Sequence, residues 1–312
     1  MRLAVIDLGT NTCNLLVAET NHRSFTILHQ SKQLVKLGDN KIRENEISPE
    51  ATERVLDSFR KHYEIIQKYK VDKVKVLATS AVRSAENKIQ FLEKLGENVG
   101  WIIKIISGEK EAELIFKGVL LAFGEIKQPS VILDIGGGSN ELILAHHSEM
   151  LWKESQPAGM ARVINRFKLS DPIQKEEISQ LQDFFHHAHK NAFLKCRNDG
   201  VKTLIGCSGA FDTIADIIDE VNPGEKQRKT QVIHLEEFNN VYQLLIHSTR
   251  EERLNMKGMD FVRVDLIVPG VILIKQLISE IGIEHIFQTD FALREGVLFE
   301  TMDVDFNMKA KF

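Results

Sequence analysis

The sequence predicts an α/β protein built from two similar halves, each with a mixed β-sheet flanked by helices. The first observation is a repeat: the segment around Asp7 returns around Asp134, 127 positions later, without a gap. Each copy reads as an apolar strand ending in aspartate, a small turn rich in glycine and hydroxyl residues, and a second apolar strand. The second observation is that strand patterns alternate with helix patterns along the chain. The hairpins at the repeats predict mixed rather than wholly parallel sheets.

The first half opens on a three-stranded meander, which a helix with a clear start signal follows. Ser48 suits the N-cap, and Pro49 suits the first turn because its fixed φ is already helical. Two further strands and a second helix complete this half. The strands are expected over 2–8, 14–19, 24–37, 74–78 and 101–106, and the helices from 49 and from about 109.

The second half repeats this plan after a break at residues 124–129. A charged loop at 225–230 is expected to be solvated. We expect domains at 1–124 and 125–295, with a C-terminal helix at 296–312 that packs back on the first domain. The strands are expected near 131–135, 141–146, 149–155, 201–206 and 285–289, and the helices near 160–167, 174–195, from 209, over 235–247 and 264–281, and from 293.

Composition limits the classes of protein that this chain can represent. Its 312 residues can bury a large core, and 43% hydrophobic with 27% charged residues is ordinary for a globular protein. A net charge of -4 argues against a broad nucleic-acid-binding surface. Three scattered cysteines predict reduced thiols rather than disulfides or zinc. No apolar run is long enough for a membrane helix, so the cytoplasm is the expected compartment.

The two repeated turns have the composition of phosphate-binding loops. Glycine lets backbone N–H groups approach an anion, and hydroxyl groups add donors. The aspartate before each turn can hold a hard cation that shares the phosphate oxygens. These are neither Walker A loops, which need Gly-Lys-Ser/Thr, nor Rossmann turns, which a helix follows. The candidate phosphate-binding residues are Gly9, Thr10, Asn11 and Thr12 in the first turn and Gly136, Gly137, Gly138 and Ser139 in the second.

Five ordered motifs give the chain a recognisable family resemblance. It resembles the exopolyphosphatase/guanosine-pentaphosphate phosphohydrolase family, a branch of the actin-like ATPase superfold, in a short form with two domains. The resemblance implies two duplicated actin-like (ribonuclease H-like) domains with the active site in a cleft between them. The motifs begin at Asp7, Ala78, Ser107, Asp134 and Gly206, and Arg294-Glu295-Gly296 near the end also matches.

The resemblance also implies roles for single residues. Arg83 would bind a phosphoryl group, although an arginine at a strand end is often only a surface residue. Asp7 and Asp134 would bind Mg²⁺ or another divalent cation, and Glu141 would bind metal or water as a second acidic residue. Ser208 and Gly209 would cradle distal phosphates or a nucleotide. Further positive charge for a polyanion is expected from Lys153, Arg162 and Arg263.

Glu111 matches the family's catalytic glutamate, which orients and deprotonates the attacking water. On its own it reads as an acidic residue in the first turn of a helix, where it favours the helix dipole. The family usually has two adjacent glutamates here, and this chain has Lys110 before Glu111. Lys110 either lowers the pKa of Glu111 or faces solvent, and Glu109 is the rival base.

The implied activity is magnesium-dependent hydrolysis of the terminal phosphate of inorganic polyphosphate. Hydrolysis of the 5′ γ-phosphate of guanosine pentaphosphate by the same residues is the first alternative. A non-catalytic sensor of polyphosphate or of the alarmone is the second, and a small-molecule kinase of the same superfold is a weaker one. A homodimer is expected, with no nucleic-acid or membrane partner.

Overall fold

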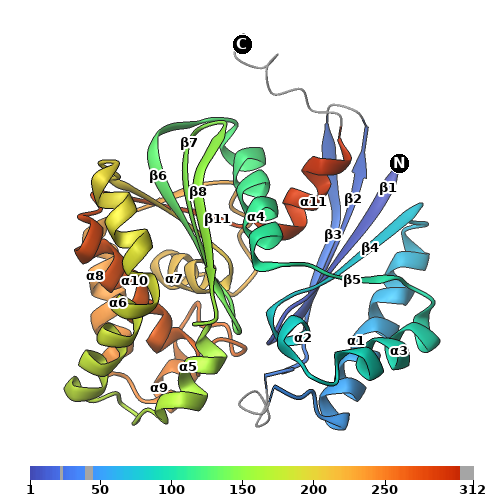
Figure 1. The fold of residues 1–312 in the computed structure, drawn as a ribbon, viewed down its shortest axis with the longest axis horizontal. Helices are drawn as coiled ribbons and strands as arrows, with labels where there is room; N and C mark the ends of the chain where they lie inside the picture. Colours follow the sequence, from blue (N-terminus) through green and yellow to red (C-terminus); the bar gives the residue numbers. More distant parts are fainter. Residues whose placement is uncertain (22–23, 39–44, 303–312) are drawn as a thin grey trace. The chain divides into compact units, whose positions relative to one another are not determined.

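The computed structural model describes residues 1–21, 24–38 and 45–302. The chain divides into two compact units (Figure 1), one formed by residues 1–121 with 293–312 and the other by residues 122–292. The segment 303–312 of the expected C-terminal helix lies outside the described residues. In the described part of the chain, no helix is both long and apolar enough to cross a membrane.

The first unit contains a five-stranded mixed sheet with the order β3-β2-β1-β4-β5. The first three strands form an antiparallel meander, and the last two run parallel to β1. The strands are β1 (Arg2–Leu8), β2 (Thr12–Thr20), β3 (Phe25–Leu34), β4 (Lys73–Ala78) and β5 (Ile103–Ile105). Its helices are α1 (Pro49–Lys68), α2 (Ser80–Ser84), α3 (Lys88–Val99), α4 (Gly108–Phe123, which ends in the second unit) and α11 (Leu293–Thr301).

Alternation along β1 divides the core of this unit between the two faces of the sheet. Ala4, Ile6 and Leu8 belong to one buried cluster that also contains Phe59 of α1 and Phe91 of α3. The opposite face, which carries Asp7, is the side on which α4 and α11 lie, and α11 packs on β1 (Figure 1). The helix from the end of the chain therefore reaches the strand that begins it.

Close approach of α11 to α4 depends on one glycine. A Cβ added to Gly296 would overlap the backbone carbonyl of Leu114. Glycine permits this approach because it lacks a side chain. The start of α1 follows the expected signal, since Ser48 Oγ accepts a hydrogen bond from the Ala51 amide at 3.1 Å and Pro49 occupies the first turn.

The second unit contains a six-stranded mixed sheet with the order β10-β11-β9-β6-β7-β8. Its meander, β6 to β8, corresponds to β1 to β3 of the first unit. The strands are β6 (Ile126–Ile135), β7 (Asn140–His147), β8 (Glu149–Gln156), β9 (Thr203–Cys207), β10 (Gln231–Ile233) and β11 (His285–Thr289). The helices are α5 (Met160–Phe167), α6 (Lys175–Asn198), α7 (Gly209–Asp219), α8 (Leu235–His247), α9 (Arg250–Asn255) and α10 (Ile267–Ile281).

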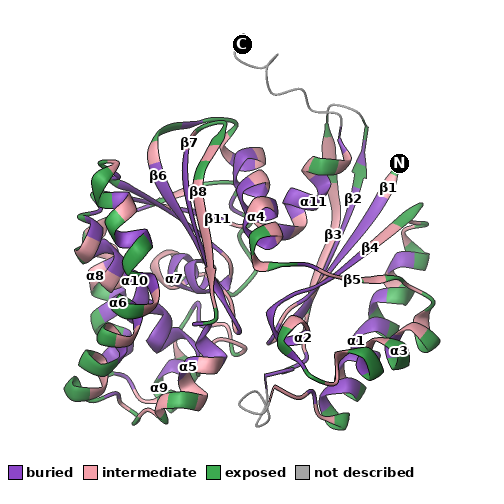
Figure 2. Cartoon of the chain, in the orientation of Figure 1, coloured by how far each residue is buried: buried purple, intermediate pink, exposed green. Residues whose placement is uncertain are grey.

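Burial follows this layered arrangement. Figure 2 shows that the strands next to the repeated turns are buried over most of their length, whereas the outer sides of α1 and α6 are exposed. Helix α10 is apolar nearly all round and packs against α5, α6, α7 and α8, which explains its burial. The predicted fold class, duplicated α/β units with mixed sheets flanked by helices, is confirmed.

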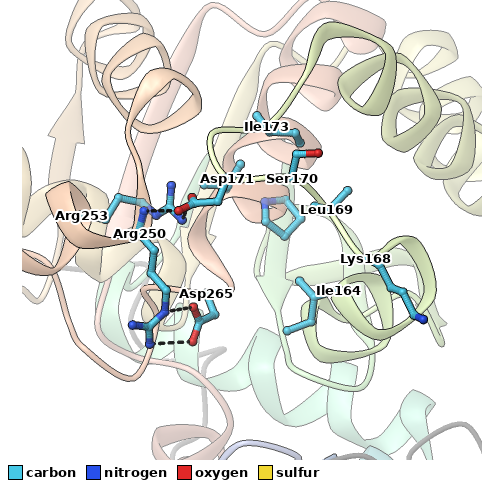
Figure 3. Close-up of a pocket in the computed structure, with 11 residues that line it drawn as sticks. Ile164, Lys168, Leu169, Ser170, Asp171, Ile173, Arg250, Arg253 and Asp265 are labelled. Carbon is cyan, nitrogen blue, oxygen red and sulfur yellow. Dashed lines mark hydrogen bonds and ion pairs between the residues drawn. The ribbon is translucent and has the colours of Figure 1, made fainter.

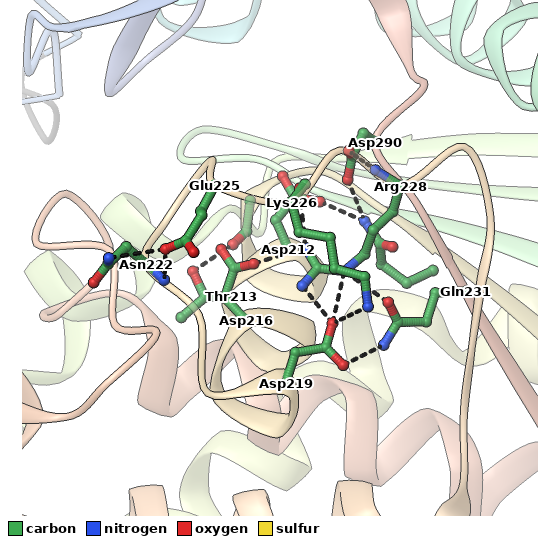
Figure 4. Close-up of polar contacts among 12 residues, drawn as sticks. Asp212, Thr213, Asp216, Asp219, Asn222, Glu225, Lys226, Arg228, Gln231 and Asp290 are labelled. Carbon is green, nitrogen blue, oxygen red and sulfur yellow. Dashed lines mark hydrogen bonds and ion pairs between the residues drawn. The ribbon is translucent and has the colours of Figure 1, made fainter.

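The charged loop at 225–230 corrects one expectation. Arg228 is 4% exposed rather than solvated. Its Nη1 lies 2.6 Å from Asp216 Oδ1 and its Nη2 lies 2.6 Å from Asp219 Oδ2 (Figure 4). The exposed Lys226 also reaches Asp219. The loop is therefore fixed to α7 by a buried arginine, which a count of charges along the chain does not reveal.

Candidate functional site

The first turn is held by its own backbone, so its side chains have a defined place. Asp7 lies near the end of β1, and the Gly9 amide donates to the Thr12 carbonyl at 2.9 Å. Asn14 Nδ2 lies 3.3 Å from Asp7 Oδ2 and 3.2 Å from Thr12 Oγ1. The Asn11 carbonyl accepts two amides of the segment after β3. The turn is thus prearranged rather than loose.

Two features of this turn fit a bound cation and phosphate. Burial raises the pKa of Asp7, and the positive charge of Arg294 and the Asn14 hydrogen bond oppose that rise. A divalent cation beside the carboxylate would stabilise its charged form. The hydroxyl of Thr10 is buried and has no hydrogen-bond partner among the described residues. Both groups gain a partner if a cation and its phosphate occupy the turn.

Arg83 and Glu111 are brought together, although 28 residues separate them along the chain. Arg83 Nη1 donates to Glu111 Oε2 at 2.9 Å and to the Ile106 carbonyl at 2.8 Å. Glu111 lies in the first turn of α4 and is 8% exposed. Glu109, the rival base, is exposed. The structure thus distinguishes a buried, oriented glutamate from an exposed one in the same turn.

The ammonium group of Lys110 forms ion pairs with glutamates other than Glu111. Its Nζ lies 2.6 Å from Glu300 Oε1 on α11 and 3.6 Å from Glu113 Oε2. Lys117 Nζ reaches the same oxygen of Glu300, also at 2.6 Å. Lys110 therefore forms an ion pair between helices rather than only facing solvent, and its expected effect on the pKa of Glu111 stays a prediction.

The second turn is built like the first and is braced by α5. The Gly136 amide donates to the Ser139 carbonyl at 3.0 Å, and the amides of Met160 and Ala161 donate to the carbonyls of Gly136 and Gly137. A Cβ on Gly159 would overlap the backbone at 137–138, so only glycine fits there. Arg162 Nε donates to the Gly138 carbonyl at 3.0 Å, which places its side chain at this turn.

Asp134 and Glu141 occupy directly opposite positions of the β6–β7 hairpin. Directly opposite residues of an antiparallel pair place their side chains on one face, with Cβ atoms about 5 Å apart. Glu141 is 1% exposed, and Ser155 Oγ donates to its Oε1 at 2.7 Å. One or two carboxylates with substrate phosphates are the usual ligands of Mg²⁺. The pair therefore fits a shared divalent cation.

The hydroxyl of Ser208 is used within the fold. Ser208 Oγ accepts a hydrogen bond from the Ile135 amide at 3.2 Å and lies 3.3 Å from the Ile135 carbonyl. This side chain therefore fixes the strand that carries Asp134. Ser208 itself precedes α7 and has a positive φ of 75°. The structure thus shows a bracing contact for Ser208, and its expected contact with phosphate stays a prediction.

Arg263 lies over Gly209. The guanidinium of Arg263 occupies the space that a Cβ on Gly209 would take. Its Nε is buried and has no hydrogen-bond partner among the described residues. A half-buried arginine with an unused donor at a glycine turn suits an anion. Gly209 therefore has a clear reason to be glycine, which the motif alone did not reveal.

Sequence reasoning assigned no role to Arg294 and Glu295, although it noted their motif. Both lie at the start of α11, where the charge of Arg294 lowers the pKa of Asp7 and the charge of Glu295 raises it. Glu295 is fully buried, with its Oε1 3.7 Å from Arg294 Nη2. Their proximity to Asp7 depends on the return of the chain end to β1, so position in the sequence could not show it.

A cavity in the second unit lies apart from the predicted residues. It has a volume of about 340 Å³ and lies between the end of α5 and α9 (Figure 3). Arg250 Nε lies 2.6 Å from Asp265 Oδ1, and Arg253 Nη2 lies 2.9 Å from Asp171 Oδ1. None of the residues predicted to bind phosphate or metal lines it. Its arginines serve to pair with aspartates.

Known proteins match nearly the whole chain. A model described as the Ppx/GppA phosphatase family matches residues 16–304. Exopolyphosphatase 2 of Mycobacterium tuberculosis is 26% identical over 95% of this chain and 97% of its own length. A bifunctional 3-dehydroquinate synthase/phosphatase of Fusobacterium nucleatum is 29% identical over 96% of this chain, which spans 46% of that protein.

Solved structures agree with these matches. The crystal structure of an exopolyphosphatase from Cytophaga hutchinsonii matches with a TM-score of 0.92 and 33% sequence identity. The match covers 97% of this chain and 98% of that one. The resemblance that the five motifs predicted is confirmed.

Proposed function

This chain belongs to the Ppx/GppA phosphatase family, and we propose that it hydrolyses the terminal phosphate of inorganic polyphosphate. The observation that carries the proposal is the ion pair between Arg83 Nη1 and Glu111 Oε2 at 2.9 Å. It joins a phosphate-binding type of side chain to a buried carboxylate. Phosphoryl transfer to water requires little more than positioned donors, neutralised charge and a base for the water.

In the proposed reaction, a water attacks the terminal phosphorus atom, and the bridging P–O bond breaks. Glu111 takes a proton from that water as it attacks. The products are orthophosphate and a chain that is one phosphate shorter. Arg83 uses Nη1 for Glu111 and for the Ile106 carbonyl, so its planar fork can meet the phosphoryl oxygens with the remaining N–H groups.

Mg²⁺ is the proposed cofactor. When bound, it would neutralise charge that develops on the phosphate oxygens. Asp134 and Glu141 are its proposed ligands in the second unit, and Asp7 is its proposed ligand in the first. The cross-strand position of the first two carboxylates supports this assignment, and so does the raised pKa of Asp7, which the charge of a cation would lower. The glycine turns would offer backbone N–H groups to the same phosphates.

Polyphosphate is proposed ahead of guanosine pentaphosphate because two matched relatives, from Mycobacterium tuberculosis and Cytophaga hutchinsonii, are named exopolyphosphatases. A side-by-side assay with Mg²⁺ tests this choice. Orthophosphate should be released faster from long-chain polyphosphate than from guanosine pentaphosphate at equal phosphate-end concentration. Faster release from the nucleotide would show that guanosine pentaphosphate, and not polyphosphate, is the preferred substrate. Tight binding of both without release from either would identify a sensor.

A further inference from the structure

Three lysines share one face at the open edge of the first sheet. Lys73 and Lys75 alternate along β4 and therefore point to the same side. Lys104 of β5 is in register with Leu77, two positions further along β4, so it lies on that side as well. This is also the side of Asp7, because Asp7 is in register with Leu77. Lys73 and Lys104 are exposed to solvent.

Two more lysines extend this row onto α4. Lys110 and Lys117 both reach Glu300 Oε1 at 2.6 Å, and Lys75 Nζ donates to Thr301 Oγ1 at 2.9 Å. The end of α11 thus contacts three ammonium groups, two through the Glu300 carboxylate and one through the Thr301 hydroxyl. We call the whole set the lysine track: Lys73, Lys75, Lys104, Lys110 and Lys117.

Positive charge on the lysine track exceeds what its neighbours neutralise. Within residues 1–21, 24–38 and 45–302, the carboxylates in ion pairs with its lysines are Glu300 and Glu113, and these pairs involve Lys110 and Lys117. Burial lowers the pKa of Lys75, and the charges of Lys73, Lys104 and Lys110 lower it further against the opposite effect of Glu300. Such crowding of like charges is unfavourable in the free protein, and a bound polyanion would relieve it. The chain as a whole carries a net charge of -4, so this concentration is local.

We propose that the lysine track binds the internal phosphates of a long polyphosphate chain. The proposal rests on the proposed function, because it extends the same substrate beyond its reacting end. Lys110 precedes Glu111, and β4 leads to the α2 turn that carries Arg83, so the track starts beside the candidate catalytic residues. From the level of Lys104 back to Lys73 it follows β4 for about 13 Å, at roughly 3.3 Å per residue.

The chemistry of the track suits polyphosphate rather than single-stranded nucleic acid. Lysine is a flexible point charge that needs no particular phosphate geometry, which fits a uniform chain. Sites for single-stranded nucleic acid combine positive charge with aromatic side chains that stack on bases. The cation–π contacts found among the described residues are made by Lys68 and Arg166 and not by lysines of the track.

The test compares the double variant Lys73→Glu/Lys104→Glu with the control Lys61→Glu/Lys68→Glu. The control changes exposed lysines of α1, on the opposite face of the sheet. The track variant should raise KM for long-chain polyphosphate at least ~10-fold and make the dependence of affinity on salt shallower. Its KM for tripolyphosphate, which is too short to follow the track, should stay within ~2-fold, and the control should behave like wild type. Thermal unfolding would verify that each variant is folded.

Direct binding of long-chain polyphosphate, measured by isothermal titration calorimetry, separates this inference from the proposed function. If the wild type releases no phosphate from polyphosphate yet binds it, and the track variant loses that affinity, the proposed function fails and the track stands. Equal effects on long and short substrates, or wild-type affinity in the track variant, would show that the lysine track does not bind the internal phosphates. Competition by single-stranded RNA at equal phosphate concentration would reassign it to nucleic acid.

Discussion

Asp134 and Glu141 face each other across the β6–β7 hairpin, whereas the same position of the β1–β2 hairpin pairs Asp7 with Asn14. The two repeats have therefore kept the backbone and diverged in charge. One offers a pair of carboxylates on one face of a sheet, and the other offers a carboxylate with an amide donor. A divalent cation prefers the first arrangement. The second unit should consequently dominate metal binding.

Replacement of Glu141 by glutamine tests this difference. The amide keeps the shape and the ability to accept from Ser155 Oγ, but it removes one negative charge from the pair. We expect the affinity for Mn²⁺, used as a spectroscopic substitute for Mg²⁺, to fall ~10–100-fold. Electron paramagnetic resonance of free Mn²⁺ measures this without substrate. Asn14→Ala in the first hairpin is the matched control and should change that affinity less, and an equal loss in both variants would refute the assignment.

The pairing of Arg83 with Glu111 predicts non-additive effects on catalysis. Arg83→Ala removes both the phosphate donor and the partner that orients Glu111, so kcat/KM should fall ~100-fold or more. Because the two side chains act as a unit, Arg83→Ala/Glu111→Gln should be little worse than the more damaging single variant. Steady-state kinetics of the four proteins measures the coupling. Losses that multiply would show that the two residues act independently.

Gly296 should be far less tolerant of alanine than Gly96. A Cβ at position 296 would overlap the Leu114 carbonyl, whereas a Cβ at position 96, in α3, meets no atom within 4 Å. We expect Gly296→Ala to lower the free energy of unfolding by ~1–3 kcal/mol or more. Gly96→Ala should be neutral or stabilise by up to ~1 kcal/mol, because alanine favours the helix. Urea unfolding measures both, and equal stabilities would contradict the close packing of α11 on α4.

Much of this architecture could be predicted from the sequence, because strand and hairpin patterns are local. The two repeated turns and the Ser48 cap are of this kind. Helix α3 and the short α2 were not predicted. The ion pairs Arg83–Glu111 and Lys110–Glu300 join distant parts of the chain, and the latter spans 190 residues. Only packing of α4 against its neighbours creates them, so a motif can nominate their members without pairing them.

The buried side chain of His62 should make the protein less stable in mild acid. It is fully buried on α1, with Nε2 3.3 Å from both Ser58 Oγ and the Cys13 carbonyl. Burial lowers its pKa from 6.5 to about 4. As the pH falls, His62 takes up a proton in the unfolded chain at a higher pH than in the folded protein. The contribution of neutral His62 to stability is therefore complete above pH 6.5 and is lost as the pH falls towards 4. This one group should lower the free energy of unfolding by roughly 2 kcal/mol between pH 7 and pH 5.

Urea unfolding at both pH values, in wild type and in His62→Gln, isolates this effect. The variant lacks the titrating group. Its loss of unfolding free energy between pH 7 and pH 5 should therefore be smaller than that of wild type by about 2 kcal/mol. Identical pH dependence in the two proteins would exclude His62 as the cause.

Glu111 is the base for the attacking water in the proposed reaction, and orthophosphate release by Glu111→Gln is the decisive measurement of that role. With saturating polyphosphate and Mg²⁺, kcat should fall ~10²–10⁴-fold while the dissociation constant for polyphosphate stays near that of wild type. Glu109→Gln, an exposed change in the same turn, should retain wild-type kcat. Near-normal release by Glu111→Gln, or a comparable loss in Glu109→Gln, would show that Glu111 is not the specific base.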